Sequence, residues 1–168
     1  QPSNFNQVVA YGVDGAEFEV SYIDPDMAAI HEGLRQVYPG QTVTLQAYND
    51  DLSRILFTTG DNRHPTGYHI LYDRKSVKTI GNERPWINPG DLGEQKWVTY
   101  PARDGMEIPA LLDLPAGYDK DRDGPIPTVV NPHGGPWSRD RGGWDNSGWV
   151  PFLTSPLAMP WPPVPPPK

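Results

Sequence analysis

The sequence predicts a mainly β fold with one or two helices. Short segments in which polar and apolar residues alternate recur along the chain, and turn-forming residues separate them, as expected for half-buried strands. Only one segment, 26–38, combines apolar residues at helical spacing with helix start and stop signals. Strands this short, with turns between them, indicate a sheet meander, a sandwich or propeller blades.

The helix has clear boundaries in the sequence. Asp24 is a typical N-cap residue, Pro25 suits the first helical position, and the Pro39-Gly40 pair ends the pattern. Apolar side chains between these signals share one helical face (Ile30, Leu34 and Val37). We therefore expect a helix of about three turns.

Strands are expected on both sides of a linker rich in Pro, Asn, Gly and Asp at 84–93. Before the linker, the expected strands are 17–22, 42–48, 54–59, 68–73 and 76–80. After it, strands at 95–100 and 106–114 are joined by a turn at Arg103-Asp104-Gly105. The apolar segment Ile126–Asn131 is expected to be a central strand of this second part, because it leads directly into a Gly pair.

Composition excludes several classes of protein. The net charge of −7 argues against nucleic acid or an anionic membrane as the main partner, since such binding requires a basic surface. The absence of Cys excludes a disulfide framework, a Cys-ligated zinc and a thiol nucleophile. We expect a soluble chain, because no segment approaches the roughly 20 apolar residues of a membrane helix and Gln1 opens no signal-peptide pattern. The compartment stays undetermined.

The second half of the chain carries the most specific pattern. It contains Ala102-Arg103-Asp104-Gly105, Leu114-Pro115, an apolar segment and then His133-Gly134-Gly135-Pro136-Trp137-Ser138-Arg139-Asp140. Together these motifs resemble the prolyl oligopeptidase family of serine hydrolases, and in particular its acylaminoacyl-peptidase and dipeptidyl-peptidase type. Upstream, Asp61-Asn62-Arg63-His64-Pro65 and Arg84-Pro85-Trp86 are similar to the end of that family's β-propeller.

The resemblance implies an internal fragment of such a hydrolase. Residues 1–90 would correspond to the last propeller blade or blades, and 91–153 to the N-terminal strands of an incomplete α/β-hydrolase domain. The nucleophile elbow G-x-S-x-G is missing, and Ser147 lies in Asp-Asn-Ser-Gly-Trp instead. Residues 154–168 form a Pro-rich tail. Back-translated and read in a neighbouring frame, this tail yields Gly-Tyr-Ala-Val, a strand of the family, so we expect it to be an out-of-frame product.

The resemblance also implies a site at the loop His133-Gly134-Gly135, which in the family helps to form the oxyanion hole. Glycines permit backbone N–H groups to approach a developing oxyanion closely. The alternative is a tight turn without a catalytic role, because no nucleophile with triad spacing accompanies it. Ser138, Asp140, Asp145 and Ser147 lie nearby in sequence without triad spacing, and Ser147 is the serine that we name as a catalytic candidate.

A second candidate site is independent of the resemblance. Asp119, Asp121 and Asp123 form the pattern D-x-D-x-D-G that opens a calcium loop. However, Val130 occupies the position where such a loop places a bidentate Glu. The alternatives are therefore a calcium site and a solvated acidic loop.

Two functions follow from these observations. The first is a truncated serine-hydrolase or peptidase-family protein, which if active would be a weak, calcium-dependent hydrolase of small esters, lactones or peptides. The second is a non-catalytic β module that binds calcium or a partner. In either case we expect a homo-oligomer, since a truncated sheet leaves strand edges and apolar faces without neighbours.

Overall fold

The computed structural model describes residues 8–15 and 18–155, which divide into two compact units. Unit 1 comprises the described residues up to Ile87 together with Arg141–Trp144. Unit 2 comprises Asn88–Asp140 and the described residues from Asp145 onward. Residues 156–168, on which the out-of-frame prediction rests, lie outside the described part of the chain.

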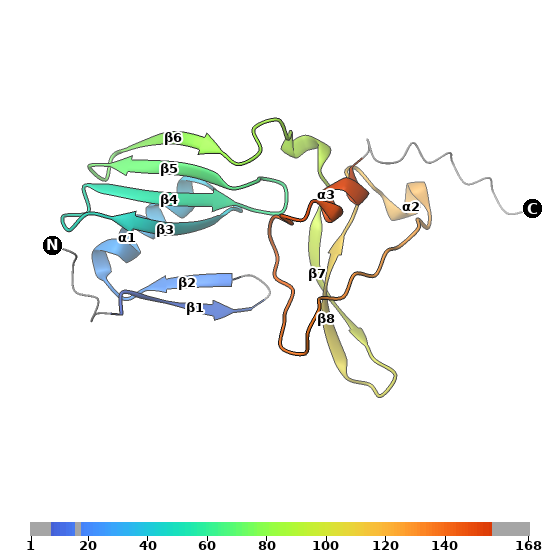
Figure 1. Ribbon diagram of the computed structural model, residues 1–168. Helices are drawn as coiled ribbons and strands as arrows, with labels where there is room; N and C mark the ends of the chain where they lie inside the picture. Colours follow the sequence, from blue (N-terminus) through green and yellow to red (C-terminus); the bar gives the residue numbers. More distant parts are fainter. Residues whose placement is uncertain (1–7, 16–17, 156–168) are drawn as a thin grey trace, which may run out of the picture. The chain divides into compact units, whose positions relative to one another are not determined.

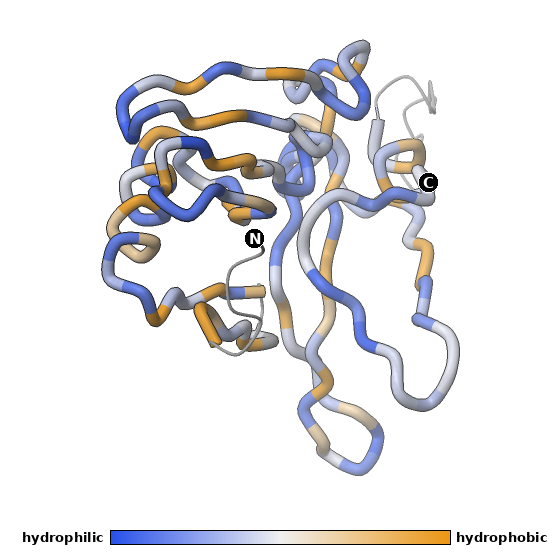
Figure 2. Tube along the Cα trace, turned by 60° about the vertical axis from the view of Figure 1, so that its left-hand side comes forward, coloured by the Kyte–Doolittle hydropathy of each residue, from blue (hydrophilic) through white to orange (hydrophobic). Residues whose placement is uncertain are grey.

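The largest element of unit 1 is an antiparallel sheet of four strands in sequential order (Figure 1). Its strands are β3 (Thr42–Tyr48), β4 (Arg54–Gly60), β5 (Gly67–Tyr72) and β6 (Ser76–Asn82). Buried and more exposed residues alternate along β4 and β5, and Figure 2 shows that the strands of the sheet carry both hydrophobic and hydrophilic residues. Of the arrangements that the sequence left open, the sheet is a meander, and the observed strand ends lie within two residues of those expected.

Helix α1 (Pro25–Val37) lies against this sheet and begins and ends as predicted (Figure 1). Asp24 caps it, because its Oδ1 accepts the Met27 N–H at 3.0 Å. Tyr38 closes the last turn by donating its N–H to the Leu34 carbonyl at 3.0 Å. Met27 and Leu34 are buried on the face that contacts the sheet.

The core of unit 1 is centred on β4, where Ile55 and Phe57 are fully buried. The alternation along β4 places these two side chains on the same face of the sheet. Apolar side chains from α1, β3, the turn between β3 and β4, and β5 complete the cluster: Met27, Leu34, Val43, Leu45, Leu52 and Leu71. A single helix over one face of a small sheet thus encloses a continuous core.

Unit 1 also contains a hairpin of β1 (Ala10–Asp14) and β2 (Phe18–Tyr22). Strand β1 was not predicted, because Gly12 interrupts its alternation of apolar residues. The Phe18 ring occupies the space beside Gly12, where a Cβ atom would lie 2.3 Å from the ring Cζ. The hairpin is joined to the rest of unit 1 by the Tyr22 hydroxyl, which accepts the Leu45 N–H at 3.1 Å.

Unit 2 is built on a hairpin of β7 (Gln95–Pro101) and β8 (Glu107–Asp113), which confirms the two strands predicted after the linker. Gly105, with φ of 86°, forms the expected turn between them. The remaining elements are short: the 3₁₀ turn η1 (Pro89–Asp91) and the helices α2 (Lys120–Asp123) and α3 (Trp149–Thr154).

The prediction of a central strand at Ile126–Asn131 is wrong. This segment forms no strand, and the Val129 and Val130 side chains are 65% and 83% exposed. Pro125 and Pro127 lack the N–H groups that a ladder requires, and no described strand pairs with the segment. An apolar sequence forms a buried strand only where neighbouring strands and a covering layer are present.

No helix in the described ranges combines the length and the apolar character that crossing a bilayer requires.

Candidate functional site

The glycine-rich loop at His133-Gly134-Gly135 is fully open to solvent. All residues from Pro127 to Arg141 are exposed, and the Trp137 side chain is 94% exposed. Gly135 has φ of 69°, a left-handed conformation that an L side chain adopts only with strain. The backbone therefore makes a glycine-dependent turn here, which is compatible with N–H groups directed at a bound anion.

Ser147, the candidate nucleophile, forms hydrogen bonds with Asp145. Its Oγ donates to Asp145 at 2.7 Å from Oδ1, and its N–H donates to the same oxygen at 2.9 Å. Asp145 Oδ2 also accepts the Val150 N–H at 2.9 Å, in the first turn of α3. Asp145 is thus bonded both to Ser147 and to the first turn of α3, whose N-cap residue is Gly148. No imidazole takes part in this arrangement, so Ser147 lacks the base that activates a serine nucleophile.

Asp113, a carboxylate of unit 2 that the sequence analysis did not single out, is influenced by Asp145. Burial raises the pKa of Asp113, and the charge of Asp145 raises it further, whereas a hydrogen bond from Gln95 opposes the shift. Burial also acts to raise the pKa of Asp145, but the N–H groups of Val150 and Ser147 and the Ser147 hydroxyl outweigh it and lower that pKa. Asp113 and Asp145 are far apart in sequence, so no local pattern could have indicated the effect of Asp145 on Asp113.

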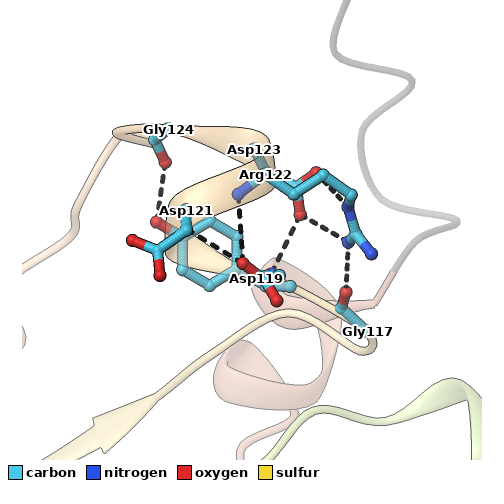
Figure 3. Close-up of polar contacts among 7 residues, drawn as sticks. Gly117, Asp119, Asp121, Arg122, Asp123 and Gly124 are labelled. Carbon is cyan, nitrogen blue, oxygen red and sulfur yellow. Dashed lines mark hydrogen bonds and ion pairs between the residues drawn. The ribbon is translucent and has the colours of Figure 1, made fainter.

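The three aspartates at 119–123 form a short capped helix, as Figure 3 shows. Asp119 Oδ1 accepts the N–H groups of Asp121 and Arg122 at 2.9 and 3.0 Å. Asp123 is held by the Arg122 guanidinium, with Nε at 2.7 Å from Oδ1 and an Nη at 2.6 Å from Oδ2. These hydrogen bonds, with one from the Asp119 N–H, lower the pKa of Asp123 to about 2.

This geometry does not fit a calcium ion. The Asp121 carboxylate points away from that of Asp119, and the Asp123 carboxylate is neutralised by Arg122 (Figure 3). Among the described residues, no three His, Cys, Asp or Glu side chains are grouped so that they could hold a metal ion. The arrangement favours the second alternative, a solvated acidic loop, and calcium dependence stays an untested prediction.

The candidate catalytic residues are therefore not assembled into a triad. The structure pairs Ser147 with Asp145 and leaves the His133 loop exposed without joining it to that pair. A Ser–His–Asp mechanism requires the base to contact the serine oxygen. In the described residues, the His133–Gly135 loop is an exposed glycine turn, and its role in binding an anion stays a prediction.

The known proteins that match this chain, as given below, are peptidases. Over 145 residues the chain is 30% identical to dipeptidyl aminopeptidase BIII of Pseudoxanthomonas mexicana. The aligned region covers 82% of the chain and 21% of that relative. The chain is similar to peptidases. Two further relatives are the probable chloroplastic glutamyl endopeptidases of rice (Oryza sativa subsp. japonica) and Arabidopsis thaliana, at 29% and 31% identity. These matches cover 46% and 45% of the chain and 8% of each relative.

The similarity supports the expected resemblance only at the level of a peptidase family. The chain spans about a fifth of the length of the aminopeptidase and less than a tenth of each endopeptidase. No family model matches the sequence, and no solved structure matches it. The narrower family type and the assignment to a propeller end and a hydrolase start stay predictions.

Proposed function

We propose that this chain is a segment of a peptidase-related serine hydrolase whose own residues do not complete a catalytic site. The observation that carries the proposal is the 30% identity to a dipeptidyl aminopeptidase over 82% of the chain. The geometry at Ser147 supports the second part of the proposal, since the Ser147 hydroxyl donates to the Asp145 carboxylate and contacts no imidazole.

The architecture of each unit supports a specific place within such a hydrolase. A four-stranded antiparallel meander is the repeating unit of β-propellers, and β3–β6 form one. We assign unit 1 to the end of a propeller on this basis. Unit 2 would then provide the first hairpin of an α/β-hydrolase domain and its glycine-rich loop.

The role proposed for the loop His133–Gly135 is to bind the oxyanion formed when an ester, lactone or peptide carbonyl is attacked. The left-handed Gly135 and the exposed backbone around it support this role. The nucleophile and its base would have to be supplied by residues outside this chain. By itself the chain would therefore hydrolyse even activated esters no faster than the buffer does.

A fluorophosphonate probe and p-nitrophenyl acetate test the proposal directly. Activated serines react with the probe, so we expect no labelling and a turnover that His133→Ala and Ser147→Ala leave unchanged. Measurements with and without chelator test calcium dependence at the same time. Labelling that Ser147→Ala abolishes, together with at least a tenfold loss of esterase activity, would contradict the proposal.

The alternative function is a partner-binding module, and a specific observation favours it. The uncharged segment Ile126–Val130 presents Val129 and Val130 to solvent, and exposed apolar segments of this kind mark interaction surfaces or aggregate. For this alternative we propose a second copy of the chain as the partner. Light scattering should then give at least twice the monomer mass, and Val130→Lys should restore the monomer. A wild-type monomer at micromolar concentration would exclude it.

A further inference from the structure

A histidine is buried at the centre of the four-stranded sheet. His69 is only 5% exposed and lies on β5, between the neighbouring strands β4 and β6. Its Nε2 lies 3.1 Å from the Thr59 Oγ1, and its Nδ1 lies 3.0 Å from the Thr79 Oγ1. Both ring nitrogens thus have a hydroxyl partner on an adjacent strand.

The same ring contacts the end of helix α1. The Tyr38 hydroxyl lies 3.4 Å from His69 Nδ1, and the two ring centroids are 5.0 Å apart. Tyr38 is the residue that closes α1, through the hydrogen bond from its N–H to the Leu34 carbonyl. His69 therefore joins the last turn of α1 to three strands of the sheet.

The surroundings fix the position of the ring. Phe57 stacks on it at a centroid distance of 5.0 Å. A Cβ atom at position 67 would lie 2.8 Å from His69 Nε2, so Gly67 leaves just enough room for the imidazole. The ring cannot turn towards solvent unless Tyr38 or the sheet moves.

The contacts suit a neutral imidazole and do not compensate a charged one. A neutral ring has one N–H donor and one acceptor, and hydroxyl groups can serve both. The residues facing the ring are Thr59 and Phe57 from β4, Thr79 from β6 and Tyr38 from α1, of which only Tyr38 is titratable. Burial lowers the pKa of His69 from its ordinary value of 6.5 and raises that of Tyr38 from 10.0, so neither carries a charge near pH 7.

We propose that His69 is a pH-sensitive latch that holds the C-terminal end of helix α1 on the sheet while its imidazole is neutral and releases it when the imidazole is protonated. A cation at this position would be buried without a counter-charge, which is costly. Release of Tyr38 and the last turn of α1 would admit water to the ring and remove that cost.

The sign of the effect follows from proton linkage. In the released state the exposed imidazole takes up a proton as the pH falls below about 6.5, whereas the closed state does so only at lower pH. The closed state is therefore fully stable above pH 6.5 and loses stability below it. Since one proton is involved, the equilibrium constant for release should rise by at most about tenfold per pH unit.

Urea unfolding of the full chain at pH 7.5, 6.5 and 5.5 tests the latch. Amide cross-peaks of α1 and of the β7–β8 hairpin report on the two units separately. We expect the α1 transition to move to lower urea concentration as the pH falls, and His69→Gln to remove most of this dependence, because Gln keeps a donor and an acceptor without titrating. His133→Gln is the control, because that histidine lies in an exposed loop of unit 2, and it should leave the pH dependence of the α1 transition unchanged.

The titration of the His69 ring in the wild-type chain gives a second measurement, which decides the matter if His69→Gln does not fold. Its ring carbon signal should titrate below pH 6.5, and the Tyr38 ring signals should change over the same range. A wild-type pH dependence in His69→Gln, or a His69 titration at 6.5 without any change at Tyr38, would overturn the proposal.

Discussion

The two units contain strands of similar length, but only one of them has a core. In unit 1, eight hydrophobic side chains are buried in one cluster around Phe57. In the described part of unit 2, Leu92 is the only buried hydrophobic residue, while Trp137, Val130 and Met106 are largely exposed. Regular strands alone do not produce a core, because the apolar face of a sheet must be covered by a second layer.

The covering layer explains the difference. In unit 1, the 13 residues of α1 provide Met27 and Leu34 to cover the four-stranded sheet. In unit 2, the sheet has two strands, and the helices α2 and α3 have four and six residues. Such short helices and an isolated hairpin are marginal in water. Unit 1 should therefore be the more stable of the two.

Truncation of a core side chain should show the largest difference in stability change between the two units. Phe57 is fully buried, so Phe57→Ala should destabilise unit 1 by about 3–5 kcal/mol. The matched substitution Val130→Ala removes an 83% exposed side chain and should change stability by less than about 0.5 kcal/mol. Urea unfolding followed by NMR signals of each unit measures both. Equal losses in the two variants would show that the burial difference has no energetic consequence.

A close backbone contact gives unit 2 its own sensitive position. A Cβ atom on Gly93 would lie 1.5 Å from the Leu114 carbonyl oxygen, whereas nothing lies within 4 Å of one built on Gly134. Gly93→Ala should therefore cost roughly 1–3 kcal/mol of hairpin stability through overpacking. Gly134→Ala should leave the hairpin intact. Cross-strand nuclear Overhauser effects between β7 and β8 report the result, and their survival in Gly93→Ala would contradict the geometry.

The smallest expected effect concerns the acidic turn of unit 2. Asp119 caps α2 through two N–H groups, so Asp119→Ala should cost roughly 1 kcal/mol of local stability. Asp121→Ala is the control, because that carboxylate points away from the cap (Figure 3). Amide exchange of Arg122 measures the cap, and the melting temperature with calcium or chelator measures metal binding. If calcium raises the melting temperature and Asp121→Ala abolishes the rise, the loop is a calcium site after all.

Local signals predicted unit 1 well. The cap at Asp24, the stop after Tyr38 and the alternation along β3–β5 depend on neighbouring residues, and the structure confirms them. The same approach failed for Ile126–Asn131. An apolar sequence indicates that a strand could be buried, but it does not show whether a neighbouring strand is present to pair with it. The cap at Asp119 was missed for a related reason, since D-x-D-x-D-G serves a helix start as well as a metal loop.

The candidate site shows the same limit. The motif around His133 indicated a peptidase relative, and the comparisons support that class. The hydrogen bonds of Asp145 to Ser147 and to the first turn of α3 were not foreseen, because they depend on α3 following directly after this turn. The contacts of His69 involve α1, β4 and β6, so no local pattern could have shown them.

Residue-resolved hydrogen exchange of the full chain tests the difference in core stability between the units most directly. The measurement is made at a concentration where light scattering gives the monomer mass. The account predicts that the amides of Ile55 and Phe57 exchange only by unfolding of unit 1, since both residues lie in a fully buried part of β4. The amides of Val129 and Val130 should exchange at the rate of an unstructured peptide. Equal protection of the two pairs would contradict the claim that only unit 1 has a stable core.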